Sequence, residues 1–194
     1  VGILLNGEET TLVSNALVVA DTQVDASGDY GMGIQVNNGA TWEGSEAYFS
    51  GNHKVGITVQ EQGSLATLRD VVVRNTKTIR NGSWGRGLSI ERGAKAQGHK
   101  VMISNNHEYG LYVGNPGTEI DLQDVTVIGT NPSGPDYFAD GVKLQDGAKV
   151  RLERVSIESN AGIGLSAGEA TEVVLIDARL GNNYAPEDVI SGIG

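Results

Sequence analysis

Seven short segments of the chain share one pattern of apolar and polar residues: a glycine, an apolar residue, a third residue that is mostly polar, and a second apolar residue. The segments are residues 2–5, 33–36, 56–59, 87–90, 110–113, 141–144 and 164–167. Alternation with a period of two is typical of a β-strand that buries one face. The pattern therefore predicts seven strands, each beginning beside a glycine.

The spacing of these segments reveals a longer repeat. Their glycines are separated alternately by 31 and 23 residues, so the full repeat is a pair of units, one long and one short. A second apolar series follows each segment after a glycine-containing turn, as in Val150, Leu152, Val155 and Ile157. The additional residue between Leu152 and Val155 predicts a bend between two strands. Apolar residues do not recur with a convincing period of 3.6, so no long helix is expected.

A unit of 23 residues with short strands cannot bury its own apolar face. Stacking the units at about 4.8 Å pairs each strand with strands above and below it and joins the apolar faces into one core. We therefore predict an all-β fold: a parallel β-helix of about seven coils, built from tandem 54-residue two-coil repeats, that forms one solenoid over residues 1–194. Hexapeptide helices, leucine-rich repeats and calcium-binding nonapeptide repeats fit this pattern worse.

The order of features within a coil resembles the right-handed β-helix repeat of the pectate-lyase-like superfamily. Each coil has a glycine with an apolar pair, a turn, a second strand and a corner, where Asn52, Asn106 and Asn160 recur once in every pair of units. The resemblance implies a right-handed solenoid with a ladder of asparagine side chains that hydrogen-bond along the stack. It does not imply an activity, because the superfamily includes lyases, hydrolases, epimerases, adhesins and non-enzymatic surface proteins.

Composition narrows the choice of partners. The net charge of −10 argues against nucleic acid and against an anionic membrane, because both recruit a basic surface. The chain has no cysteine and no apolar run long enough for a membrane span. It begins and ends near repeat glycines without polar caps, so we expect a segment of a longer protein whose open coil ends associate end to end.

Motifs of β-helix enzymes are missing from the sequence. Hydrolases, epimerases and lyases of the resembled superfamily carry Asp-Asp, Asp-Pro-His-Glu or Arg-x-Pro-x-x-Arg motifs, none of which occurs here, so we assign no catalytic residue. We interpret His53 and His107, which occupy the same place in successive pairs of units, as repeated corner residues rather than a metal or catalytic pair. No cofactor is expected. We interpret four acidic residues as solvated surface carboxylates, with one adventitious Ca²⁺ ion as the alternative: Asp121, Asp124, Asp136 and Asp140.

The long units carry the candidate binding site. Their additional residues form loops 22–31, 76–85 and 130–139, and each loop holds an aromatic residue at the same place. In the resembled superfamily this loop borders a cleft for polymers, beside the outer face of the first strands. We expect five side chains to be exposed on that face: Gln35, Thr58, Ser89, Tyr112 and Lys143. The candidate binding residues are Tyr30, Trp84, Phe138, Tyr112, Lys143 and Glu91. The alternative is that the loop aromatics are packing clasps over the coil below.

The duplicated repeat favours a non-enzymatic function over an enzymatic one. Tandem repetition reproduces every site, whereas a catalytic site needs one asymmetric group of residues. We therefore expect a non-enzymatic extracellular or cell-surface module, acting as a spacer or in adhesion or assembly, with a polysaccharide or another surface protein as partner. The alternative is a fragment of a polysaccharide-active enzyme, or a carbohydrate-binding β-helix, that uses the strand face bordered by the loops.

Overall fold

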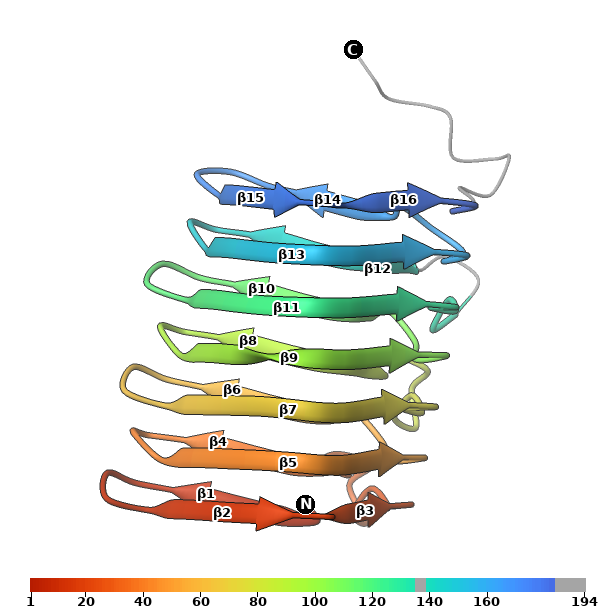
Figure 1. Cartoon of the computed structure of the whole chain (residues 1–194). Helices are drawn as coiled ribbons and strands as arrows, with labels where there is room; N and C mark the ends of the chain where they lie inside the picture. The colour runs from red at the N-terminus through yellow and green to blue at the C-terminus, as the bar shows by residue number, and fades with distance from the viewer. Residues whose placement is uncertain (135–138, 184–194) are drawn as a thin grey trace.

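A computed structural model describes residues 1–134 and 139–183, which wind through seven stacked coils (Figure 1). One strand of each coil belongs to the first sheet: β1 (Ile3–Asn6), β4 (Ile34–Asn37), β6 (Val55–Gln60), β8 (Arg86–Glu91), β10 (Tyr109–Gly114), β12 (Asp140–Gln145) and β14 (Leu165–Ala167). The second sheet holds β2 (Thr11–Asn15), β3 (Val18–Ala20), β5 (Thr41–Ser50), β7 (Leu65–Arg74), β9 (Lys95–Ser104), β11 (Glu119–Ile128), β13 (Lys149–Glu158), β15 (Glu172–Ile176) and β16 (Arg179–Gly181). We number the coils 1 to 7 by their strands in the first sheet.

The pairing of strands confirms the predicted solenoid. All seven repeat segments form strands of the first sheet, and each pairs in parallel with the equivalent strand of the next coil. Ile34 thus pairs with Ile57, and Ile57 pairs with Leu88. No helix occurs among the described residues, and so none there could span a membrane. The parallel β-helix therefore follows from the period-two pattern.

The core lies between the two sheets and runs through the whole stack. Side chains at the two apolar positions of each central repeat segment are fully buried, as are their counterparts in the second sheet, such as Leu68 and Leu122. Each such leucine or isoleucine contributes roughly 1.5–3 kcal/mol by leaving water. In coil 2 the buried rings of Trp42 and Phe49 meet edge to face, with centroids 5.6 Å apart.

The predicted bend in the second strand is confirmed. Arg154 has a φ of 51°, and the residues at the same place in neighbouring coils also adopt the left-handed conformation. From coil 3 onward these bend residues are Asp70, Lys100, Asp124, Arg154 and Asp177. The strands pair with neighbouring coils on both sides of the bend, so one residue per coil redirects the chain without ending the sheet.

The predicted asparagine ladder is wrong in its connections. Asn52, Asn106 and Asn160 are buried at one corner, but they are two coils apart, because each full repeat contains two coils. The carbonyl oxygen of the Asn106 side chain accepts a hydrogen bond from the Thr76 amide at 3.0 Å, and its amide nitrogen donates to the Val73 carbonyl at 3.2 Å. Asparagine side chains therefore tie most coils together through the backbone, and one direct link occurs where Nδ2 of Asn160 donates to Oδ1 of Asn183 in the next coil at 2.8 Å.

The end coils are less covered than the central ones. Leu4, Val13 and Val18 in coil 1 and Val174 and Leu180 in coil 7 are exposed. Among the described residues, β1 pairs only with β4 and β14 only with β12, so each leaves one edge free. End-to-end association stays a prediction.

Candidate functional site

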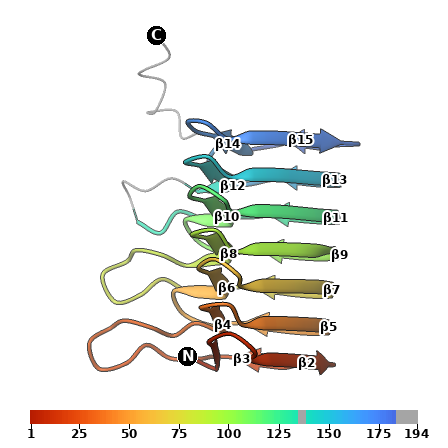
Figure 2. The same ribbon diagram turned by 90° about the vertical axis from the view of Figure 1, so that its left-hand side faces the viewer.

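Loops 22–31 and 76–85 and the described part of loop 130–139 lie on one side of the solenoid, one above the other (Figure 2). Loop 22–31 approaches loop 76–85 so closely that a Cβ atom at Gly28 would lie 3.1 Å from Cβ of Arg80. The equivalent glycine, Gly82, would place a Cβ atom 3.4 Å from the Ser133 carbonyl oxygen. Both glycines have φ above 80°, which favours glycine. The loops thus form a continuous wall beside the first sheet.

The aromatic residues of this wall have strained backbones. Tyr30 has a φ of 64° and Trp84 a φ of 66°, and a bulky residue in this region costs on the order of 1–3 kcal/mol. Tyr30 remains 52% exposed, whereas Trp84 is partly buried. Phe138, the third predicted aromatic, lies outside the described residues. Tyr30 and Trp84 thus share one left-handed backbone conformation at the same place in two loops.

Arg86 lies at the centre of a group of aromatic rings. Its guanidinium carbon is 4.4 Å from the ring centroid of Trp84, 4.1 Å from that of Tyr112 and 5.1 Å from that of Tyr109. Cations in this position are attracted by the negative face of the ring, by about 0.5–2 kcal/mol per contact. The loop residue Trp84 and the strand residues Tyr109 and Tyr112 are therefore held together by one side chain.

Two carboxylates fix the Arg86 guanidinium. Nε and Nη2 of Arg86 donate to Oε2 and Oε1 of Glu108 at 3.0 and 3.3 Å, and Nη1 lies 3.5 Å from Oε1 of Glu91. The same Glu91 oxygen accepts the hydroxyl hydrogen of Ser89. The side chains of Arg86 and Glu91 are each only 12% exposed, and that of Glu108 is 19% exposed. Such bidentate, partly buried pairing holds the guanidinium plane in one orientation.

Lys54 extends this group toward the first coils. Its ammonium nitrogen lies 5.0 Å from the Trp84 centroid, 5.9 Å from the Tyr30 centroid and 3.7 Å from Oδ1 of Asp29. Rings and cations thus alternate along the solenoid axis. We call this set the cation–aromatic row: Tyr30, Lys54, Trp84, Arg86, Tyr109 and Tyr112. It reaches from coil 2 to coil 5, about 14 Å at about 4.8 Å per coil.

Two tyrosines form the upper end of the row. The rings of Tyr109 and Tyr112 stack with centroids 5.6 Å apart and an interplanar angle of 27°. The Tyr112 hydroxyl lies over Gly114, where a Cβ atom would come within 2.7 Å of it. Burial raises the pKa of both phenols above the ordinary value of 10. Both hydroxyls therefore stay protonated at neutral pH.

The structure brings most of the predicted binding residues together. Trp84, Tyr112 and Glu91 meet at Arg86, and Lys143 lies beside Tyr112 in the next coil. Our expectation of an exposed strand face is wrong at its centre, because Thr58, Ser89 and Tyr112 are at most 7% exposed. Large neighbouring side chains of the row occupy this face.

Sequence reasoning missed three members of the group: Lys54, Glu108 and Tyr109. It also did not place Arg86 at the centre. A signal was present, because Arg86 and Tyr109 each precede a repeat glycine, and residues at that position lie in adjacent coils. The residues equivalent to Arg86 in the other two-coil repeats are Met32 and Asp140. The group is therefore asymmetric and occurs at one place in the described repeats.

The histidines occupy the predicted corners. Nδ1 of His53 is 3.1 Å from the Thr22 carbonyl oxygen, and Nδ1 of His107 is 2.8 Å from that of Thr76. The β-carbons of both histidines lie close to loop glycines, Gly31 and Gly85, which leave no room for a Cβ atom of their own. These contacts support the interpretation as repeated corner residues. Within residues 1–134 and 139–183, no group of three or more His, Cys, Asp or Glu side chains is arranged to hold a metal ion.

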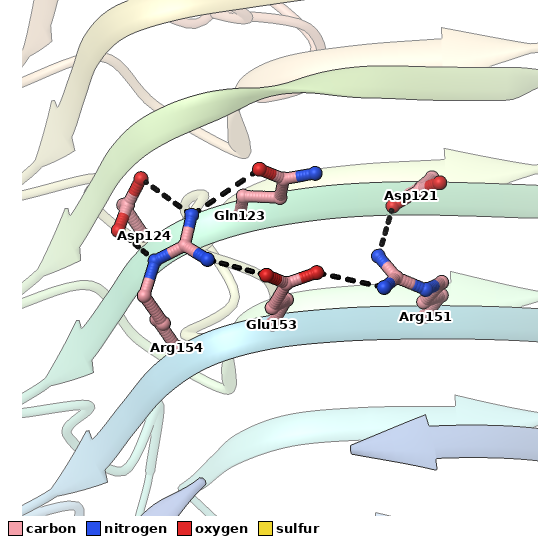
Figure 3. Close-up of polar contacts among 6 residues, drawn as sticks. All are labelled: Asp121, Gln123, Asp124, Arg151, Glu153 and Arg154. Carbon is pink, nitrogen blue, oxygen red and sulfur yellow. Dashed lines mark hydrogen bonds and ion pairs between the residues drawn. The ribbon is translucent and has the colours of Figure 1, made fainter. Parts of the chain in front are cut away.

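The four acidic residues considered for Ca²⁺ do not form one group in the described chain. Asp121 and Asp124 lie on the outer face of the second sheet, where they pair with Arg151 and Arg154 (Figure 3). Asp140 is buried on the first sheet and accepts hydrogen bonds from the Ile163 amide and the Ser166 hydroxyl. Asp136 lies outside the described residues.

The outer face of the second sheet carries a separate network of charges (Figure 3). Arg154 donates to both oxygens of Asp124, at 2.7 and 3.1 Å, and also bonds to Glu153. Arg154 lowers the pKa of Asp124, and Arg151 lowers that of Glu153. Lys100 pairs with Asp70 in the coils below. Bend residues of adjacent coils thus carry opposite charges from coil 3 upward.

Comparison with known families agrees with this architecture. A family model described as a right handed beta helix region matches residues 32–193, well over half of the chain. The match covers every member of the cation–aromatic row except Tyr30. No curated protein and no solved structure shows significant similarity to the chain. The family match and the structure therefore agree on the fold.

Proposed function

The chain belongs to the right-handed β-helix family, and from this premise we propose that it is a non-enzymatic, extracellular or cell-surface module that binds a polysaccharide along the cation–aromatic row. The observation that supports this function is the row itself, in which rings and fixed polar groups follow the solenoid axis beside a wall of loops. An extended polymer fits a linear row of this kind better than a compact ligand does.

The exposure of the loop aromatics supports ligand binding, rather than packing alone, at Tyr30. A packing clasp needs a buried ring, and Trp84 fits that role because both Lys54 and Arg86 lie against it. Tyr30 has the same strained backbone but leaves half of its surface in solvent. The exposed ring of Tyr30 therefore offers a stacking surface to a sugar.

The carboxylates beside the row already accept hydrogen bonds from protein groups, which favours binding without turnover. Both oxygens of Glu108 accept hydrogen bonds from Arg86, and Glu91 pairs with Arg86 and Ser89. Glycoside hydrolysis needs two carboxyl groups that face the substrate on either side of the scissile bond. The alternative function, a fragment of a polysaccharide-active enzyme, would use the same face but would release new reducing or unsaturated ends.

Affinity electrophoresis in gels that contain soluble polysaccharides tests the proposal. We expect at least one polymer to retard the protein, and Tyr30→Ala to weaken retardation by about 5- to 150-fold, which corresponds to about 1–3 kcal/mol of stacking energy. The matched control is Tyr48→Ala, since Tyr48 lies on the second sheet and also contacts a cation, Arg74 at 5.0 Å. Equal loss in both variants, or release of sugar ends by the wild-type chain, would refute the proposal.

A further inference from the structure

Every cation in the cation–aromatic row is neutralised by a neighbouring carboxylate. Lys54 pairs with Asp29 at 3.7 Å, and Arg86 pairs with Glu108 at 3.0 Å and with Glu91 at 3.5 Å. Two positive charges therefore face three negative ones. The row offers cations as fixed hydrogen-bond donors and ring partners, but it has no surplus of positive charge.

Charges that border the row do not reverse this balance. Three further cations lie on the loop wall and the neighbouring strand, and four carboxylates lie near them: Lys77, Arg80 and Lys143, and Asp21, Asp25, Asp140 and Asp146. The chain as a whole carries a net charge of −10. A polyanion approaching this face would meet a negative field and would have to displace bound carboxylates from Arg86.

We infer that the row selects neutral polysaccharides and rejects anionic ones, an inference that rests on the polysaccharide-binding function proposed above. A neutral sugar unit presents hydroxyl groups and apolar C–H faces, which match phenol hydroxyls, carboxylate oxygens and the open face of Tyr30. Uronic acid polymers add one carboxylate per unit, and the row has no free cation to receive it. The pairing of Arg86 with Glu108 thus makes the row selective against anionic ligands.

The first experiment compares neutral and anionic polymers in one gel system. The neutral probes are galactomannan, xyloglucan and hydroxyethylcellulose, and the anionic probes are polygalacturonate and alginate. Each polymer is tested at salt concentrations of about 0.05 and about 0.5 M, because charges are screened much more strongly at the higher concentration. We expect retention by a neutral polymer that changes less than about twofold with salt, because no counterions are released. Salt-sensitive retention by anionic polymers alone would overturn this inference and leave polymer binding intact. Retention by none would overturn the proposed function.

The second experiment removes the carboxylate that neutralises Arg86. Glu108→Gln keeps the shape of the side chain but frees one positive charge on Arg86, so we expect weak binding of polygalacturonate to strengthen about fivefold at low salt. That ratio corresponds to about 1 kcal/mol, the energy of two unit charges 4 Å apart in water. The matched control is Glu119→Gln, which changes the net charge equally and frees Lys95 on the second sheet. Equal responses of the two variants to polygalacturonate would overturn the inference.

Discussion

Replacing Arg86 by methionine should destabilise the solenoid more than replacing any exposed arginine of the described chain. The change keeps much of the side-chain volume but leaves Glu108 and Glu91 without their shared cation at 19% and 12% exposure. Removing one partner of a fully buried pair costs about 3–5 kcal/mol. The residual exposure lowers this figure, and loss of the contacts with three rings raises it, so we expect a loss of about 3 kcal/mol.

The control for this prediction is Arg92→Met. Arg92 pairs with Glu61 at 3.0 Å, but its side chain is 59% exposed, and exposed pairs contribute about 0–1 kcal/mol. Adding Glu108→Gln to Arg86→Met should recover part of the loss, because the double variant no longer buries the stranded charge.

Urea unfolding followed by far-ultraviolet circular dichroism gives the free energy from the midpoint and the slope. Tryptophan fluorescence, reporting on Trp42 and Trp84, checks that unfolding is a single transition. A loss below about 1 kcal/mol for Arg86→Met, equal to that of Arg92→Met, would refute our view of Arg86 as the organising residue of the row.

Two further predictions concern the charged face of the second sheet. Arginines lower the pKa of Asp124 and Glu153 below their ordinary values of 3.8 and 4.5, so the stability that these groups contribute is complete above about pH 5 and is lost as the pH falls through the lowered values. In the double variant Asp124→Asn, Glu153→Gln, the unfolding temperature should therefore fall less between pH 5 and lower pH than it does in wild type. An identical fall in both proteins would contradict this prediction. Arg154→Glu should lower the unfolding temperature. Adding Asp124→Arg, which swaps the two charges, should not restore it, because the new arginine would face Lys100. Full restoration would indicate that Arg154 and Asp124 form an isolated ion pair rather than part of a series of alternating charges.

The architecture could be predicted because it depends on local patterns that every coil repeats. The Gly-apolar-x-apolar segments place strands and their buried faces, and the 31- and 23-residue spacings place the loops. The additional residue before Val155 locates the bend at Arg154. Each of these features is decided by a few neighbouring residues and by stacking on an equivalent copy.

The binding site was less predictable because it depends on differences between the repeats. Arg86 stands where the equivalent residues are Met32 and Asp140, so periodicity alone assigns it no special role. Its partners come from its own coil and from the next one, and only the stacking order shows that Glu108 in coil 5 reaches it. The asparagine ladder failed for a related reason: one full repeat spans two coils, so Thr76 lies between Asn52 and Asn106.

The opposite charges of adjacent bends restrict how such an array can change in length. Deleting one coil from the region between Asp70 and Asp177 would bring two bend residues of like sign together, and it would place two coils of the same length class in contact. Deleting two coils preserves both the charge order and the alternation of long and short loops. Recombination that removes one full two-coil repeat should therefore cost less stability than removal of a single coil, because it keeps the ion pairs of the second sheet and the order of the loops.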